Sequence, residues 1–261
     1  MKATEVKLLP PRILLYGDYG TGKTFFIGLL HEELKKRGTK GIRLFDFDLS
    51  QTLPNFNFDV DIGDTYGKYL TTTGFDAFIR EFSQYEEDPD GFGGFAIDSL
   101  TTLQQVVMSW VHRKFPQVKR PLSFLSSRQD WGVLIEVFNQ ILPQLQKISQ
   151  HSLIVVTAHI RRNPDATGQK EIPLPAVAGS TLPSSLGLWF TEVWLTRVEG
   201  TAFNPKYVIQ TRPDDMFKCK TQIKDMPGVA ESHVVLAKLI ETMFAKTAEA
   251  AETAEAAKVE A

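Results

Sequence analysis

The sequence has little cysteine and no long apolar run. Its single cysteine, Cys219, cannot form an internal disulfide and has no cysteine partner for a zinc site, so neither a disulfide framework nor a structural metal is expected. No stretch is long and apolar enough to span a membrane, and residues 1–11 lack the apolar core of a signal peptide. These absences favour a protein of the cytoplasm with no membrane partner.

Neither sign of charge predominates. The chain carries 29 Lys and Arg residues against 31 Asp and Glu residues, so the net charge is −2. Such a chain does not coat nucleic acid indiscriminately, and any contact with DNA has to be local. Residues 99–129 contain no acid and interleave basic with aromatic side chains, a pattern that can follow a phosphate backbone. The candidate contacts there are Arg113, Lys114, Lys119 and Arg120. A solvated helix end followed by a loop is the alternative.

The length and the rhythm of the chain predict one α/β domain. At 261 residues, with 43% hydrophobic and 23% charged residues, it can bury one substantial core. Short apolar runs alternate with helical patterns, which is typical of a mostly parallel central β-sheet flanked by helices. Strands are expected at 12–16, 42–47, 95–98, 152–157, 192–198 and 207–210, and helices at 24–37, 74–85, 101–114, 131–150 and 233–244. The last strands are expected to be antiparallel.

Two segments fall outside this rhythm. Residues 163–183 are rich in proline and glycine and predict a long loop, which in a compact domain is usually functional. Residues 245–261 repeat Ala, Glu, Thr and Lys without an apolar face, so we expect a frayed helix or a disordered tail. The predicted domain therefore covers residues 1–244.

The most specific motif lies at residues 17–24, which read GDYGTGKT and fit the pattern G-x-x-x-x-G-K-[ST]. Its glycines allow backbone N–H groups to surround an anion, the following helix points its positive end at the phosphates, and the lysine reaches the outer phosphate oxygens. A strand precedes the motif and an amphipathic helix follows it, as this mechanism requires. The expected nucleotide-binding residues are Gly17, Asp18, Tyr19, Gly20, Thr21, Gly22, Lys23, Thr24 and Phe25. The expected cofactors are ATP and Mg²⁺.

An acidic residue closes a buried strand further along the chain. Asp98 ends the predicted strand 95–98, where a carboxylate can hold magnesium opposite a phosphate loop. Thr24 and Asp98 are therefore the expected metal residues, and Lys23 and Asp98 are expected to serve catalysis. The alternative is that Asp98 only caps the next helix.

From these motifs onward, residues 12–228 resemble the RecA-type ATPase core, and within it the phage Sak-type RecA-like single-strand annealing proteins, an AAA-type ATP-binding family. The resemblance implies a RecA-like P-loop fold and a DNA-stimulated ATPase that binds single-stranded DNA and promotes annealing or recombination. It also implies a homo-oligomer with ATP near subunit interfaces, a single-strand-binding protein as a candidate partner, and the host cytoplasm as location.

The resemblance assigns four further catalytic residues. Asp46-Phe47-Asp48 stands where RecA-like proteins have Asp-Ala-Glu, so Asp48 is the candidate base, one methylene shorter than the family's glutamate. His159, in Ala158-His159-Ile160-Arg161, stands where a polar residue senses the γ-phosphate. Lys218 and Lys220 resemble a Lys-x-Lys segment that reaches a neighbouring subunit's ATP. The alternatives are a capping Asp, a hydrogen-bonded His and a pair of surface lysines.

The resemblance also interprets the long loop as a second DNA-binding loop, with Arg161, Arg162 and Lys170 as candidate contacts. Only eleven residues precede the first predicted strand, whereas RecA has an N-terminal helix and strand there, so a smaller oligomer is expected rather than a filament. Two other functions stay open. One is a nucleotide-gated scaffold or accessory factor in phage replication or packaging with little turnover, and the other is a small-molecule kinase.

Overall fold

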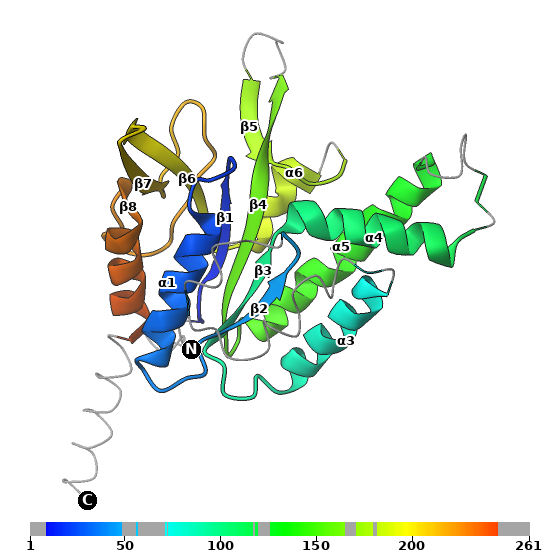
Figure 1. The fold of residues 1–261 in the computed structure, drawn as a ribbon, viewed down its shortest axis with the longest axis horizontal. Coiled ribbons are helices and arrows are strands. Elements are labelled where there is room, and N and C mark those ends of the chain that lie inside the picture. The colour runs from blue at the N-terminus through cyan, green and yellow to red at the C-terminus, as the bar shows by residue number, and fades with distance from the viewer. Residues whose placement is uncertain are drawn as a thin grey trace, which may run out of the picture.

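A twisted central sheet with helices on both faces organises the computed structural model (Figure 1). The structure describes residues 9–48, 56, 71, 73–116, 118–119, 126–164, 171–179 and 182–244. The strands are β1 Arg12–Gly17, β2 Ile42–Asp46, β3 Gly94–Asp98, β4 Leu153–Pro164, β5 Glu171–Pro175, β6 Glu192–Thr201, β7 Asn204–Gln210 and β8 Val229–Glu231. The helices are α1 Lys23–Lys35, α3 Gly74–Glu87, α4 Leu100–Lys114, α5 Arg128–Ile148, the short α6 Leu182–Ser185, the 3₁₀ helix η4 Leu186–Trp189 and a last helix at residues 232–244.

The strand order is β2-β3-β4-β1-β6-β7-β8, with β5 paired to β4. Neighbours from β2 through β6 are parallel, whereas the pairs β6–β7 and β7–β8 are antiparallel. The predicted class, a mostly parallel α/β sheet with antiparallel strands toward the C-terminus, is therefore confirmed. Because parallel strands end at one edge, β1, β2, β3 and β4 bring their carboxyl ends together there.

Alternation along β1 shows how both faces of the sheet become buried. Leu14 and Tyr16 pack into the core beneath α3, α4 and α5, while Ile13 and Leu15 pack into the core beneath α1 and the last helix. All four side chains are at most 1% exposed. A strand buried on both faces has to be apolar at every position, which is why residues 13–16 carry no charge.

The predicted long loop at 163–183 is wrong over much of its length. Strand β4 continues to Pro164 and pairs antiparallel with β5, from Ile160 opposite Pro175 to Pro164 opposite Glu171. The two strands form a ribbon that extends beyond the edge of the main sheet (Figure 1). The prolines of β5 hid this strand, since proline inside an apolar run argues against a central strand but is tolerated at an edge.

Helix boundaries differ less. The helix predicted at 131–150 begins at Arg128, because Ser127 and Asp130 form a reciprocal capping box. Ser127 Oγ accepts a hydrogen bond from the Asp130 amide at 3.2 Å, and the Asp130 carboxylate accepts one from the Ser127 amide at 2.7 Å. Pro143 lies inside this helix without ending it.

None of the helices in the described parts of the chain is long and apolar enough to cross a membrane. The tail expected at residues 245–261 lies outside the described residues. The prediction of a single domain over 1–244 stays a prediction.

Candidate nucleotide-binding site

The phosphate loop joins β1 to α1 at the carboxyl edge of the sheet. Gly20 and Gly22 have φ angles of 66° and 88°, the left-handed region that favours glycine. Gly22 precedes the helix and supplies no side-chain cap, and the first turn of α1 carries no acidic residue. The first N–H groups of α1 are therefore available to an anion, and the helix dipole favours one there.

Lys23 closes the loop on itself. Its side chain is 6% exposed, and its Nζ donates hydrogen bonds to the carbonyl oxygens of Gly17 at 3.1 Å and Asp18 at 2.8 Å. Burial lowers the pKa of the Lys23 ammonium, and the negative charges of Asp98, Asp48 and Asp18 oppose this shift. The ammonium thus lies between the loop backbone and two carboxylates of the site.

Asp98, at the end of β3, is fully buried and bound by two threonines. One carboxylate oxygen accepts a hydrogen bond from Thr24 Oγ1 at 2.7 Å, and the other accepts one from Thr157 Oγ1. Burial raises the pKa of Asp98, and the nearby charge of Asp48 raises it further. The cap of α4 is Ser99, whose side chain accepts from the Thr102 amide, so Asp98 is not the capping residue.

The Thr24 hydroxyl and the Asp98 carboxylate are oxygen ligands of the kind that magnesium prefers, and they already touch each other. A buried carboxylate with a raised pKa also gains from a cation beside it. The residues present therefore fit a magnesium ion held next to the phosphate loop.

Asp48 follows β2 and is held by three side chains. Its Oδ1 accepts hydrogen bonds from Ser99 Oγ at 2.8 Å and Thr102 Oγ1 at 2.5 Å, and its Oδ2 lies 3.1 Å from His159 Nε2. Burial raises the pKa of Asp48, but the hydrogen bonds from His159, Thr102 and Ser99 outweigh it, so the net pKa lies below the ordinary 3.8. Asp48 is therefore a fixed, ionised carboxylate.

His159 connects three parts of the site. It lies opposite Gly17 in the pairing of β4 with β1, and its amide donates to Thr101 Oγ1 at 2.9 Å. Its ring lies 4.7 Å from the ring of Tyr19, centroid to centroid. Its Nδ1 is buried and has no hydrogen-bond partner in the described part of the chain. One residue later, at Ile160, the pairing with β5 begins.

Lys218 and Lys220 flank Cys219, whose Sγ lies 3.9 Å from the hydroxyl of Tyr16, the residue before the phosphate loop. Lys218 is exposed, and Lys220 forms a bridge with Val193, which pairs with Leu14 in the middle of β1. The Glu192 carboxylate accepts a hydrogen bond from the Gln222 amide at 3.0 Å and so ties this segment to β6. In the described part of the chain, neither lysine side chain forms a hydrogen bond or ion pair with the phosphate loop, Asp48 or Asp98.

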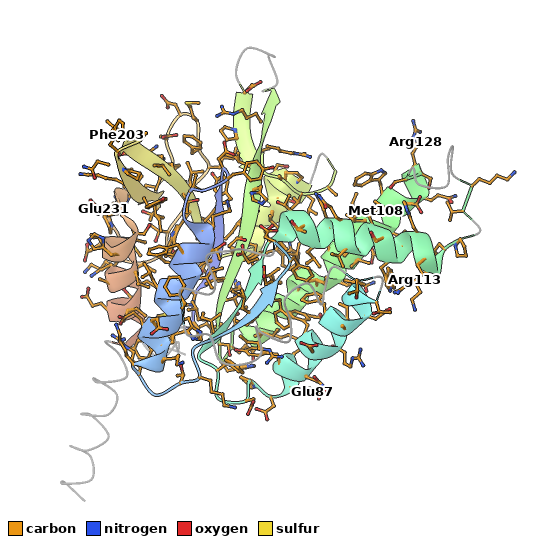
Figure 2. The ribbon with its side chains drawn as sticks, viewed as in Figure 1. Glu87, Met108, Arg113, Arg128, Phe203 and Glu231 are labelled. Atoms are coloured by element: carbon orange, nitrogen blue, oxygen red, sulfur yellow. The ribbon has the colours of Figure 1, made fainter. Side chains whose placement is uncertain are left out.

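The candidate DNA contacts separate into two places. Arg113 (Figure 2) and Lys114 lie in the last turn of α4. Arg113 Nη2 lies 2.5 Å from the Asp76 carboxylate of α3, and Lys114 Nζ lies 3.9 Å from it. The acid-free segment of the sequence thus acquires an acidic neighbour in the fold. Lys119 is exposed, as is Arg162 on the ribbon, where Arg161 donates to the Gly179 carbonyl at 2.7 Å. Arg120 and Lys170 lie outside the described residues.

Sequence reasoning missed the polar residues that position the carboxylates. Ser99, Thr102 and Thr157 hold Asp48 and Asp98, and Thr101 holds the backbone of His159. A signal was present for one of them, because Thr157 ends an otherwise apolar strand. Thr101 and Thr102 lie three and four residues after Asp98, but they look like the ordinary start of a helix.

Comparison with known proteins adds a family. The profile of a family described as an AAA domain matches residues 9–223, which include every residue of the site above. No curated protein matches the sequence. Among solved structures, the crystal structure of the KaiC-like protein PH0186 from the hyperthermophilic archaeon Pyrococcus horikoshii OT3 is similar, with 14% identity and a TM-score of 0.41. That match covers 77% of this chain and 78% of the other.

Proposed function

Since the chain belongs to the AAA domain family, we propose that it is a magnesium-dependent ATPase whose activity is stimulated by single-stranded DNA. The observation that carries this proposal is the ionised carboxylate of Asp48, fixed by Ser99, Thr102 and His159 beside the buried pair Asp98 and Thr24. A phosphate loop, a metal-binding acid and a second, separate acid are the parts that ATP hydrolysis needs.

Each residue has a distinct task in this proposal. The N–H groups at the start of α1 and the Lys23 ammonium bind the phosphates, and the Thr24 hydroxyl and Asp98 carboxylate hold magnesium. When bound, magnesium neutralises charge on the phosphate oxygens. The Asp48 carboxylate orients a water by accepting its hydrogen bond and takes up its proton as the water attacks.

The ribbon of β4 and β5 is the element through which DNA would act. His159 contacts Asp48, and β4 runs on from His159 without a break into the ribbon that carries Arg161 and Arg162. A DNA single strand bound to the ribbon would shift β4 and with it the His159–Asp48 contact. The rate of ATP hydrolysis would then depend on whether DNA is bound. This coupling would serve an oligomer that anneals single DNA strands, as the Sak-type proteins do.

One observation favours a second function. The carboxylate of Asp48 has a lowered pKa and accepts three hydrogen bonds already, so it is a weak base. A weak base supports slow turnover, which fits a nucleotide-gated scaffold that binds ATP and changes its partners with little hydrolysis.

The test is phosphate release from ATP with no DNA, with single-stranded DNA and with duplex DNA. We expect single strands to raise the rate several-fold in the wild-type protein, and Arg162→Ala, which alters an exposed ribbon residue, to reduce the stimulation without changing the basal rate. Lys147→Ala, on the exposed surface of α5, is the matched control. ATP hydrolysis at the same rate with and without saturating single-stranded DNA would refute stimulation by DNA. ATP binding without hydrolysis would favour the nucleotide-gated scaffold.

A further inference from the structure

A hollow adjoins the phosphate loop on the side away from the two carboxylates. Its volume is about 360 Å³, within the range of small-ligand sites. It is lined by the first turns of α1, by β7 and by the junction of β8 with the last helix: Phe25, Leu29, Asn204, Pro205, Lys206, Tyr207, Glu231, Ser232 and His233. No step of the proposed hydrolysis uses these residues beyond the start of α1.

The sheet order determines which end of a nucleotide points to this hollow. The residues proposed for cleavage follow β2 and β3 or lie on β4, which are all on one side of β1 in the sheet. The hollow is lined from β7 and β8, on the other side of β1. A triphosphate in the loop with its outer phosphate near Asp48 therefore directs its nucleoside toward β7.

One residue that lines the hollow, Tyr207, also contacts the phosphate loop. A Cβ atom placed on Gly22 would lie 3.2 Å from the ring of Tyr207, so this ring covers the last glycine of the loop. Phe25 follows Thr24 in the first turn of α1. Phe25 and Tyr207, which both line the hollow, are therefore also the residues that border the phosphate loop.

Two half-exposed aromatic rings line this small space. Phe25 is 41% exposed and Tyr207 is 42% exposed, whereas aromatic residues of the cores, such as Phe26 and Trp194, are fully buried. Leu29 adds an aliphatic wall one helical turn beyond Phe25. Flat apolar faces beside a phosphate site are suited to a nucleobase, which stacks on aromatic rings.

The polar groups of the rim are held in place by the fold. Ser232 Oγ donates a hydrogen bond to the Tyr207 carbonyl oxygen at 3.2 Å, which ties β7 to the start of the last helix. Glu231 and His233 pair at 3.5 Å across the same junction. These contacts keep the Tyr207 side of the hollow in one arrangement.

We propose that the hollow is the nucleobase subsite of the nucleotide site, with Phe25 and Tyr207 as the aromatic contacts of a purine. A purine is preferred because its larger ring system stacks over more area than a pyrimidine. The inference rests on the proposed function, since it places the base of the nucleotide whose phosphates bind residues 17–24.

The experiment measures dissociation constants by calorimetry for ATP, CTP and inorganic tripolyphosphate, each with magnesium. Base stacking contributes roughly 1–3 kcal/mol per base, so Phe25→Ala and Tyr207→Ala should each weaken ATP about 5- to 150-fold. Binding of tripolyphosphate should stay within about twofold, and Tyr207→Phe should retain ATP affinity. The wild-type protein should bind ATP more tightly than CTP. In Tyr207→Ala the ratio of the CTP to the ATP dissociation constant should be smaller.

Phe203→Ala is the matched control, because Phe203 is a fully exposed aromatic residue in the turn between β6 and β7 (Figure 2). It should change neither ATP nor tripolyphosphate binding.

An equal loss of affinity for ATP and tripolyphosphate in Tyr207→Ala would mean that the ring supports the loop, and it would overturn the subsite. Unchanged ATP affinity in both Phe25→Ala and Tyr207→Ala would also overturn it. Equal affinity of the wild-type protein for ATP and tripolyphosphate would overturn the nucleobase subsite. It would not contradict phosphate binding by residues 17–24. Binding of neither ligand would refute the proposed function itself.

Discussion

Asp98 ends β3 and Asp48 follows the neighbouring strand β2, yet their environments move their pKa values in opposite directions. Asp98 is sealed from water, and burial raises its pKa, whereas three donors keep Asp48 ionised. In active sites, two acids whose pKa values are shifted in opposite directions commonly have different catalytic roles. Under the proposed function, Asp98 would hold the metal and Asp48 would face the attacking water.

Asp48→Asn tests the role given to the second acid. Removing a base that acts in the transition state typically costs 100-fold or more in rate, so the turnover number should fall by roughly that factor. The ATP dissociation constant should stay within about threefold, because no phosphate-binding residue is altered. Asp90→Asn, in an exposed turn, is the control and should leave both quantities unchanged. Turnover above a third of the wild-type value in Asp48→Asn would rule out Asp48 as the base.

At the level of single residues, the motif predicted where Lys23, Thr24 and Asp98 would lie, because their chemistry is encoded in local spacing. Tyr207 and Thr157 were not predicted as site residues. Tyr207 lies beyond β6 in the chain and reaches the loop only because β6 pairs with β1 and β7 pairs with β6. Contacts of this kind depend on which strands are neighbours, and strand order is not written in any single segment.

Among the elements, the segment that carries Lys218 and Lys220 is tied down by a buried acid. Glu192, 1% exposed, accepts hydrogen bonds from the Gln222 amide at 3.0 Å and from Trp194 Nε1 at 3.2 Å. Burial raises the pKa of Glu192 above its ordinary 4.5, and the hydrogen bonds only partly oppose this.

This raised pKa predicts a pH dependence of stability. Between pH 4.5 and the folded pKa the folded chain binds the proton and the unfolded chain does not, so the stabilisation by protonation is full below about 4.5 and is lost as the pH rises. The free energy of unfolding of the wild type minus that of Glu192→Gln should therefore be larger at pH 4 than at pH 7. Urea unfolding at both pH values measures it. A difference that grows with pH would show that Glu192 is held as a stabilised carboxylate.

The elements also show why one prediction was wrong. The periodicity of helices and central strands identified α1, α3, α4, α5, β1, β2, β3, β6 and β7 to within a few residues and the first part of β4, whereas β8 was not predicted. The ribbon of β4 and β5 was not predicted, because its second strand, residues 171–175, contains two prolines and is stabilised by pairing with β4. An edge strand draws its stability from pairing, which a local pattern does not contain.

For the whole molecule, Lys218 and Lys220 raise the question of a neighbour. Lys218 is exposed and lies on the segment that bridges β6. A cation that acts across a subunit interface stabilises the charge on the departing phosphate only after assembly, so hydrolysis depends on the neighbour.

Mixing tests this dependence. If Lys218 acts on a neighbour's ATP, an equimolar mixture of wild type and Lys218→Ala should hydrolyse ATP at a rate that differs clearly from the mean of the two separate rates, with the variant inhibiting the wild type. Lys224→Ala, which removes an exposed lysine nearby, should mix without effect. A mixture of wild type and Lys218→Ala that equals the mean would count against action in trans.

The central claim is that residues 17–24 bind the phosphates of ATP through Lys23 and the start of α1. The most direct measurement is calorimetric titration of magnesium and ATP into the wild-type protein and Lys23→Ala. Losing a charged hydrogen-bond donor costs about 1.5–3 kcal/mol, so the variant should bind ATP roughly 10- to 150-fold more weakly while melting at nearly the same temperature. A wild-type protein that binds no ATP, or a variant that binds it as tightly as the wild type, would contradict the account.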